Sequence, residues 1–335
     1  MNQLPKIRKQ SYSDSILEAF EFLLSSRSEV FVIGQGLWSP WYVGQTMSGL
    51  EKKFGRDRVI DTPVSESACT GAGVGAALNG MRPIVVHPRM DFMMYAVDPI
   101  VNQAAKWSYI FGGQSNCPVT IRGIINRGGE QGAQHSQALH AMFAHFPGLR
   151  VVMPYSPSDA RDLLVSSVLC NDPVIFIDDR WLYEEEASVK SEIKIYDLNN
   201  LKPKKIAKGD SVTIVAAGYS SKLAIDASKL LYQKDITCDI FDLRILTDIN
   251  IKPITTSVKK TNSLVVIDGG WSSYGLGGEI IARVCESVEP GTLKTKPLRI
   301  SIAPAPAPTA TNLEDVYYPS PKLISKKILS LLSLT

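Results

Sequence analysis

A single carboxylate stands at the start of a segment rich in small residues. Glu66 follows the polar stretch 61–65 and precedes Gly71, Gly73 and Gly75, which are separated mainly by alanine and valine. A helix built from such residues can pack backbone against backbone. A carboxylate before it suits contact with a ligand held at an interface, but it also suits capping of the positive end of the helix dipole. Composition alone favours the cap.

A histidine lies in a second polar loop, residues 132–137, which reads Gly-Ala-Gln-His-Ser-Gln. Histidine titrates near neutral pH and is therefore suited to proton transfer, although a lone histidine such as His135 is more often a hydrogen-bonded structural residue. Phe92 reads as a core residue on pattern alone. The remaining histidines show neither partners nor a spacing that fits a metal pair: His87, His140 and His145.

Bulk properties limit the function classes. The chain has 335 residues, enough for two domains, with 44% apolar and 21% charged residues. A net charge of +3 without a block of like charges does not indicate a nucleic-acid partner. Five scattered cysteines without metal spacing suit a reducing compartment. Neither a signal core nor an apolar run of roughly 20 residues is found, so we expect a cytoplasmic protein that does not enter a membrane.

The first half alternates short apolar runs with helical patterns. Helical patterns follow Ser13 and fill about 92–111 and 157–169. Such alternation predicts a mostly parallel sheet with helices on both faces. The expected strands are 30–34, 83–87, 118–122, 149–153 and 173–177.

The second half predicts a smaller α/β domain. Residues 184–210 change character, with three glutamates, Pro203 and several lysines, and are interpreted as a surface linker. Alternation then restarts, and Ala303–Pro308 reads as an extended arm. The fold class is therefore α/β with two doubly wound domains, at 1–185 and 211–335, joined by a linker at 186–210.

Common site signatures are missing. Gly71-x-Gly73-x-Gly75 differs from the dinucleotide pattern G-x-G-x-x-G, because the residues before it are polar and the third glycine comes one position early. The phosphate-loop, zincin and hydrolase motifs do not occur either. Spacing alone does not decide the function.

Several stretches taken together resemble the β subunits of thiamine-diphosphate-dependent 2-oxoacid dehydrogenases, that is, of the pyruvate, branched-chain and acetoin dehydrogenase first components. The resemblance extends from about residue 10 to 325. The stretches that carry it are Asp61–Glu66, Asp98–Lys106, Gly112-Gly113, Gly132–Gln137, Phe143–Pro154 and Asp268–Trp271.

The resemblance implies a transketolase-like pyrimidine-binding domain followed by a transketolase C-terminal domain. In this family thiamine diphosphate lies between subunits, and the α subunit holds the diphosphate and Mg²⁺ through a Gly-Asp-Gly…Asn motif. This chain has no Gly-Asp-Gly. The resemblance therefore implies an α partner in an α₂β₂ heterotetramer, no metal ligand in this chain, and a lipoyl acyltransferase as a further partner.

The resemblance also implies roles for four residues. Glu66 would hydrogen-bond the pyrimidine nitrogen N1′ and favour the imino tautomer of the cofactor. Phe92 would stack on the pyrimidine ring. His135 would donate a proton to the 2-oxoacid or the acyl group, or position it. Gln35 would lie near the cofactor channel.

The chain departs from the family pattern at three places. Gln35 stands where the family usually has glutamate, which puts proton relay between sites in doubt. Cys170 stands where several relatives have an acid at a potassium site, so K⁺ binding is left open. Residues 38–42 are unlike those of the pyruvate and branched-chain enzymes.

The leading hypothesis is a β subunit that decarboxylates a 2-oxoacid and passes the acyl unit to a lipoyl group. A second hypothesis is a carboligase half that transfers the acyl unit to an aldehyde or ketone, and residues 35 and 38–42 keep it open. A third is a non-catalytic structural or regulatory paralogue, against which Glu66 and His135 both argue.

Overall fold

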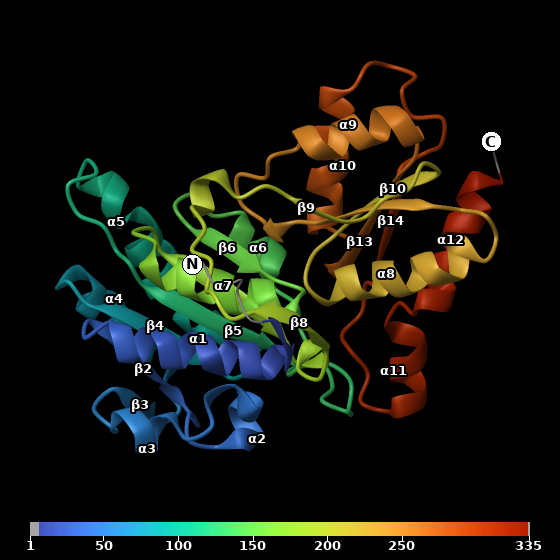
Figure 1. The fold of residues 1–335 in the computed structure, drawn as a ribbon. Helices are drawn as coiled ribbons and strands as arrows, with labels where there is room; N and C mark the ends of the chain where they lie inside the picture. The colour runs from blue at the N-terminus through green and yellow to red at the C-terminus, as the bar shows by residue number, and fades with distance from the viewer. Residues whose placement is uncertain (1–6, 334–335) are drawn as a thin grey trace, which may run out of the picture. The chain divides into compact units, whose positions relative to one another are not determined.

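The computed structural model describes residues 7–333 and divides them into two compact units (Figure 1). The first unit contains the chain up to Asn126 and again Phe143–Asn200. The second contains Arg127–Met142 and the chain from Leu201 onward. The stretch 186–210, interpreted from sequence as a linker, contains two short strands, β8 (Glu186–Lys190) and β9 (Lys204–Ala207).

The first unit is built on six parallel strands in the order β6-β7-β5-β4-β2-β3. The central strands are buried along most of their length, as expected for a parallel sheet covered on both faces. An antiparallel ribbon pairs β8 with β1 (Ile7–Ser11). The six strands are β2 (Val30–Gln35), β3 (Val59–Thr62), β4 (Arg82–His87), β5 (Thr120–Ile125), β6 (Arg150–Met153) and β7 (Val174–Asp179).

The helices of the first unit include one departure from expectation. The pattern at 92–111 predicts one long helix, but the chain there forms three consecutive pieces of different pitch. Pro99 lies at the start of the middle, π-helical piece and cannot continue regular α-helical hydrogen bonding. The pieces are the 3₁₀ helix η2 (Met90–Ala96), the π helix η3 (Asp98–Ala104) and α5 (Ala105–Ile110). The other helices are α1 (Tyr12–Ser26), α2 (Pro40–Val43), α3 (Leu50–Phe54), α4 (Glu66–Leu78) and α7 (Pro157–Leu169), with short 3₁₀ turns at Gly44–Met47, Arg180–Leu182 and Leu198–Asn200.

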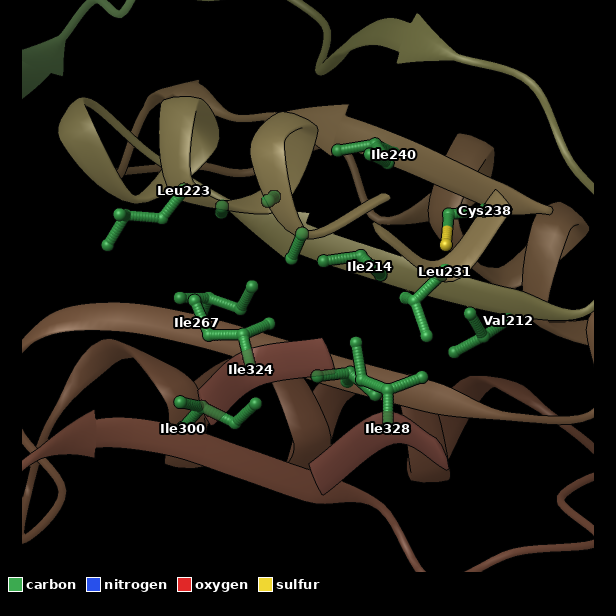
Figure 2. Close-up of a cluster of buried hydrophobic side chains, with 14 residues drawn as sticks. Val212, Ile214, Leu223, Leu231, Cys238, Ile240, Ile267, Ile300, Ile324 and Ile328 are labelled. Atoms are coloured by element: carbon green, nitrogen blue, oxygen red, sulfur yellow. The ribbon is translucent and has the colours of Figure 1, made fainter. Parts of the chain in front are cut away.

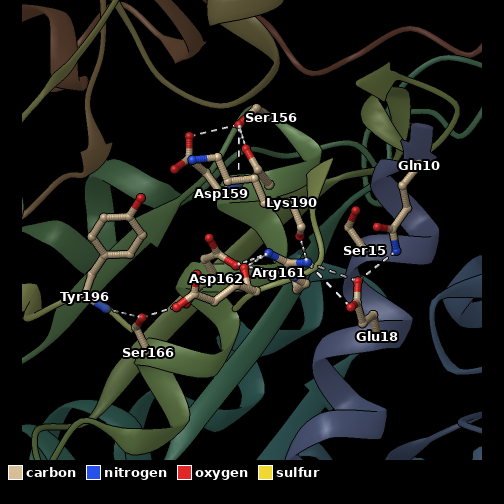
Figure 3. A network of polar contacts seen from close by, with 12 residues as sticks. Gln10, Ser15, Glu18, Ser156, Asp159, Arg161, Asp162, Ser166, Lys190 and Tyr196 are labelled. Carbon is tan, nitrogen blue, oxygen red and sulfur yellow. Dashed lines mark hydrogen bonds and ion pairs between the residues drawn. The ribbon is translucent and has the colours of Figure 1, made fainter. Parts of the chain in front are cut away.

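A buried arginine connects α1 and α7, which pack against each other, with the strand β8 (Figure 3). Arg161 is 1% exposed and donates to the carbonyl oxygens of Lys190 at 2.7 Å and Glu192 at 2.8 Å. Its Nε donates to Asp162, and its Nη1 lies 3.4 Å from a Glu18 carboxylate oxygen. A buried guanidinium needs this complete set of acceptors, because an unpaired buried charge is strongly destabilising.

The second unit contains a five-stranded sheet in the order β14-β13-β10-β11-β9. All neighbouring pairs are parallel except β11–β9. No helix among residues 7–333 is long and apolar enough to cross a bilayer. The strands other than β9 are β10 (Val212–Ala216), β11 (Cys238–Asp242), β13 (Leu264–Trp271) and β14 (Leu298–Ile302), and β12 (Arg244–Ile245) is a short additional strand. The helices are α8 (Tyr219–Tyr232), α9 (Lys252–Thr261), α10 (Leu276–Ser287), α11 (Thr311–Tyr317) and α12 (Pro321–Leu332), while α6 (His140–Ala144) lies where the chain returns to the first unit.

The core of the second unit lies between one face of this sheet and the helices α8 and α12 (Figure 2). Ile214 of β10 lies beside Leu231 of α8, and Ile267 of the adjacent strand β13 lies beside Ile324 of α12. All four are at most 1% exposed. Burying side chains of this size contributes roughly 1.5–3 kcal/mol each. This packing fixes β13, whose last part contains the glycine-rich segment Asp268–Gly270 described below.

Candidate active site

The carboxyl edge of the first unit's sheet gathers three of the residues singled out from the sequence. Gln35 is the last residue of β2, and His87 is the last residue of the adjacent parallel strand β4. Glu66 is the first residue of α4, which follows β3 on the other side of β2. In open parallel sheets ligands bind at this edge. The topology therefore brings Gln35 and Glu66 to the place where a ligand is expected.

The helix that begins at Glu66 is held closely against the sheet. A Cβ atom at Gly73 would lie 2.5 Å from Cγ2 of Val85 in β4, so only glycine allows this approach. One turn nearer the helix start, Thr70 Oγ1 and His87 Nε2 are 3.1 Å apart and both side chains are buried. Glu66 itself is half-buried. The start of α4 thus has a fixed position and still presents a partly accessible carboxylate.

His87 needs a correction to the sequence interpretation, which gave it no partner. Its Nε2 atom is hydrogen-bonded to Thr70, a pairing that the sequence separation of 17 residues does not reveal. Burial lowers the pKa of His87 to about 4, because the charged imidazolium would lose its hydration. His87 is therefore neutral at physiological pH and serves to attach α4 to β4.

Phe92 lies on η2, which packs against α4. It is half-buried rather than fully in the core, and its ring stacks with that of Tyr95 at a centroid distance of 6.5 Å and an interplanar angle of 26°. Tyr95 is 69% exposed. The two rings provide aromatic surface close to the helix that begins with Glu66.

The segment after β2 is attached to β3. The backbone amide of Leu37 donates to Asp61 Oδ1 at 3.1 Å, and Trp38 Nε1 donates to the Val59 carbonyl at 3.0 Å. Gly34 has no room for a Cβ, which would lie 2.3 Å from the Val86 carbonyl oxygen. These contacts fix the direction in which the chain leaves β2 and so fix the position of Gln35.

Thiamine diphosphate, the cofactor that the family resemblance implies, carries an aminopyrimidine ring. Such a ring requires an acid or carboxylate at a ring nitrogen and an apolar surface against its flat face. Glu66 and Phe92 supply these two groups from packed elements, and each is only partly buried. The residues present fit the pyrimidine end of thiamine diphosphate. Among residues 7–333, no group of three or more His, Cys, Asp or Glu side chains is arranged to hold a metal ion.

His135 belongs to the second unit by its contacts. It is half-buried within an irregular loop, where its backbone amide donates to the Gly132 carbonyl and the neighbouring Ser136 hydroxyl donates to the same oxygen at 2.8 Å. The structure thus brings Gln35, Glu66 and Phe92 together in one unit and assigns His135 to the other.

The second unit contains a buried pair that corrects the interpretation of His140 as having no partner. His140 Nε2 lies 2.8 Å from Asp268 Oδ1, and both side chains are 2% exposed. Burial alone would raise the pKa of Asp268, but the His140 imidazole and two backbone amides hold it below its usual value. The two residues are 128 positions apart, so no local pattern could indicate the pair; the only sequence signal was Asp268-Gly-Gly-Trp.

Cys170 lies at the end of α7, where the guanidinium group of Arg82 contacts the backbone. Arg82 Nη1 donates to the carbonyl oxygens of Val168 at 2.9 Å and Cys170 at 2.8 Å, and its Nη2 donates to Asn171 at 2.7 Å. Burial raises the pKa of the Cys170 thiol. The carbonyl groups at this helix end are thus satisfied by a guanidinium.

Comparison with known proteins covers nearly the whole chain. Residues 8–185 match the family model described as transketolase, pyrimidine binding domain, and residues 202–324 match transketolase, C-terminal domain. The pyruvate dehydrogenase E1 component subunit beta of Rickettsia bellii is 38% identical over 92% of this chain and 94% of its own length. The mitochondrial pyruvate dehydrogenase E1 component subunit beta of Bos taurus is 35% identical over 95% of this chain and 89% of its own length. The solved structure of a split gene transketolase, an inactive beta4 tetramer, is 18% identical with a TM-score of 0.76 over 97% of this chain and 98% of its own, which shows the shared fold.

Proposed function

Since the chain belongs to the family of pyruvate dehydrogenase E1 component beta subunits, we propose that it is the β subunit of a thiamine-diphosphate-dependent 2-oxoacid dehydrogenase. In this role it decarboxylates a 2-oxoacid jointly with an α subunit and passes the acyl unit to a lipoyl group. The observation that carries the proposal is the identity of 38% over 92% of the chain to a relative of that name. Glu66 and Phe92, on packed elements at the carboxyl edge of the sheet, support it.

Each candidate residue has a physical role in this proposal. Bound thiamine diphosphate supplies the electron sink for decarboxylation. Glu66 holds a proton at the pyrimidine nitrogen, and Phe92 packs against the flat face of the ring and orients it. Gln35 offers an amide near the cofactor, which can donate or accept a hydrogen bond but cannot act as an acid. His135 donates a proton to an oxygen of the substrate or positions that oxygen.

We further propose that the α subunit carries the diphosphate and Mg²⁺ and that the two chains form an α₂β₂ heterotetramer. The lack of a Gly-Asp-Gly motif supports this division of the cofactor site. A lipoyl acyltransferase is the proposed acyl acceptor. Arg82 already contacts the carbonyl groups of Val168 and Cys170, which argues against a required K⁺ at that place.

We place the protein in the cytoplasm. All five cysteines lie among the described residues and are free thiols, which suits a reducing compartment. Some relatives are mitochondrial by name, so the test is where an epitope-tagged full chain is found after cell fractionation.

The activity is tested by mixing the chain with a co-encoded α-like subunit, thiamine diphosphate and Mg²⁺. Addition of pyruvate or a branched-chain 2-oxoacid should give CO₂ release and acylation of a lipoyl domain, and a Glu66→Ala variant should lose both. Release of an α-hydroxyketone without lipoyl acylation would instead identify a carboligase. Equal activity of the Glu66→Ala mixture would contradict the proposal and favour a non-catalytic paralogue.

A further inference from the structure

The loop that carries His135 has no regular secondary structure. Residues 126–139 form neither helix nor strand. Four residues in its first part have positive φ angles between 62° and 73°, namely Gly128, Gly129, Glu130 and Gly132. A segment without helix or strand depends largely on contacts with neighbouring elements for its order. The position of His135 therefore depends on what anchors this loop.

Both ends of the loop are attached to the same segment, Asp268–Gly270, in the last part of β13, where the pairing with β14 shifts register. At the start of the loop, Arg127 Nη1 donates to the Gly269 carbonyl at 3.2 Å. At its end, His140 Nε2 lies 2.8 Å from Asp268 Oδ1. All of these residues belong to the second unit. This strand segment thus holds the two ends of a 14-residue span, which removes much of the loop's conformational freedom.

The sequence of the segment Asp268–Gly270 is adapted to these contacts. A Cβ at position 269 would lie 2.8 Å from Arg127 Nη1, and one at position 270 would lie 3.1 Å from His140 Cε1. Asp268 is in turn held by the backbone, since its carboxylate accepts from the Gly270 amide at 2.9 Å and from the Gly277 amide at 3.4 Å. The Asp-Gly-Gly sequence therefore has a physical reason: one carboxylate to bind the histidine and two glycines to let the loop ends approach.

The middle of the loop has a second attachment. The Glu130 amide donates to Glu314 Oε2 at 3.2 Å, and the Thr311 hydroxyl donates to Glu130 Oε1 at 2.9 Å. Both partners lie on α11. The ends of the loop are thus held by the segment Asp268–Gly270 and its middle by α11. His135 lies in the part of the loop between Glu130 and His140, five residues from the buried histidine.

We propose that His140 and Asp268 are positioning residues, and that the strand segment Asp268–Gly270 acts as a clamp that fixes the loop bearing His135. This inference rests on the proposed function in one respect only, which is that His135 meets the substrate. A misplacement of about 1 Å of a group near the reacting atoms can reduce a rate by roughly 10²-fold. Loss of the clamp therefore lowers kcat more than it changes KM.

The test compares two substitutions of one residue in the full-length chain. His140→Gln retains a side-chain N–H that can reach Asp268, whereas His140→Leu has a similar volume and no donor. Hydrogen exchange of residues 127–142 is measured on the chain, and kcat and KM are measured after mixing with the α-like subunit. We expect His140→Leu to speed exchange in this segment at least about 10-fold and to lower kcat by about 10- to 100-fold, with His140→Gln within a few-fold of wild type in both.

A matched control removes a buried hydrogen bond elsewhere in the same unit. Ser257 donates to Asp239 from α9 and is 3% exposed. Ser257→Ala should leave exchange of residues 127–142 and kcat at wild-type values. If His140→Leu fails to fold, Gly270→Ala, which pushes a Cβ against His140, replaces it and is judged in the same way.

The inference is overturned if hydrogen exchange of residues 127–142 in His140→Leu proceeds at the wild-type rate, or if exchange in this variant is faster while kcat does not change. It is also overturned if Ser257→Ala speeds exchange of these residues as much as His140→Leu does. An inactive wild-type mixture would instead refute the proposed function. The exchange measurement then still decides whether the clamp exists, since it needs no activity.

Discussion

Replacement of Gly73 by alanine should destabilise the first unit, whereas the same replacement at Gly75, two residues along α4, should stabilise it. At Gly73 the added Cβ would lie 2.5 Å from Cγ2 of Val85. Val85 is completely buried, and its branched side chain has little rotamer freedom. At Gly75 nothing lies within 4 Å of the added atom.

The expected magnitudes follow from two opposing terms. Alanine in place of glycine within a helix stabilises by about 0.5–1 kcal/mol. Overpacking of a tight core contact costs about 1–3 kcal/mol. Gly75→Ala should therefore raise the free energy of unfolding by up to about 1 kcal/mol, and Gly73→Ala should lower it by up to about 2 kcal/mol.

Urea unfolding of the isolated chain followed by tryptophan fluorescence measures this difference. Four of the five tryptophans belong to the first unit, namely Trp38, Trp41, Trp107 and Trp181, so the signal reports mainly on that unit. Because α4 begins with Glu66, Gly73→Ala should also weaken thiamine diphosphate binding by the assembled complex. Equal shifts of the same sign for both variants would refute the close packing of α4 on β4 as the reason for the glycine.

Three further outcomes are expected. The folded pKa of His87, about 4, lies below its unfolded value of 6.5. The neutral form of His87 therefore contributes about 3 kcal/mol to the free energy of unfolding, which is complete above pH 6.5 and lost as the pH falls toward 4. Plots of the free energy of unfolding against pH should converge for wild type and His87→Gln over that range, and parallel plots would contradict this. Asp178→Asn leaves the fully buried Arg122 without its ion-pair partner at 2.7 Å and should lower the free energy of unfolding in urea by about 3–5 kcal/mol. The control Asp226→Asn, at a more exposed ion pair, should lower it by at most about 1 kcal/mol. Similar losses for the two variants would show that burial is not the cause. Phe92→Ala should raise the calorimetric Kd for thiamine diphosphate in the assembled complex by about 3- to 10-fold, and an unchanged Kd would exclude stacking.

Local patterns were sufficient for much of the fold. The apolar runs at 30–34, 83–87 and 173–177 correspond to β2, β4 and β7, because strands of a parallel sheet are buried on both faces and read as continuous apolar segments. The helix at 157–169 is confirmed as α7. The stretch expected as one long helix at 92–111 is helical but is not a single regular helix. Pro99 and the packing against α4 divide it into 3₁₀, π and α pieces.

Long-range pairings could not be predicted in the same way. His87 with Thr70 and His140 with Asp268 join residues on different elements, and no periodicity within either element records the partner. Equally, nothing local predicts that Arg127–Met142, which lie within the sequence of the first domain, have their contacts in the second unit. The candidate roles of Glu66, Phe92 and His135 came from the family resemblance and remain predictions.

The most direct test of the central claim is calorimetric titration of thiamine diphosphate with Mg²⁺ into the purified chain, first alone and then mixed with the co-encoded α-like subunit. A β subunit that supplies only the pyrimidine side of the cofactor site should bind the cofactor in the mixture and not alone, and Glu66→Ala should weaken the binding in the mixture. Tight binding by the chain alone would contradict the divided site.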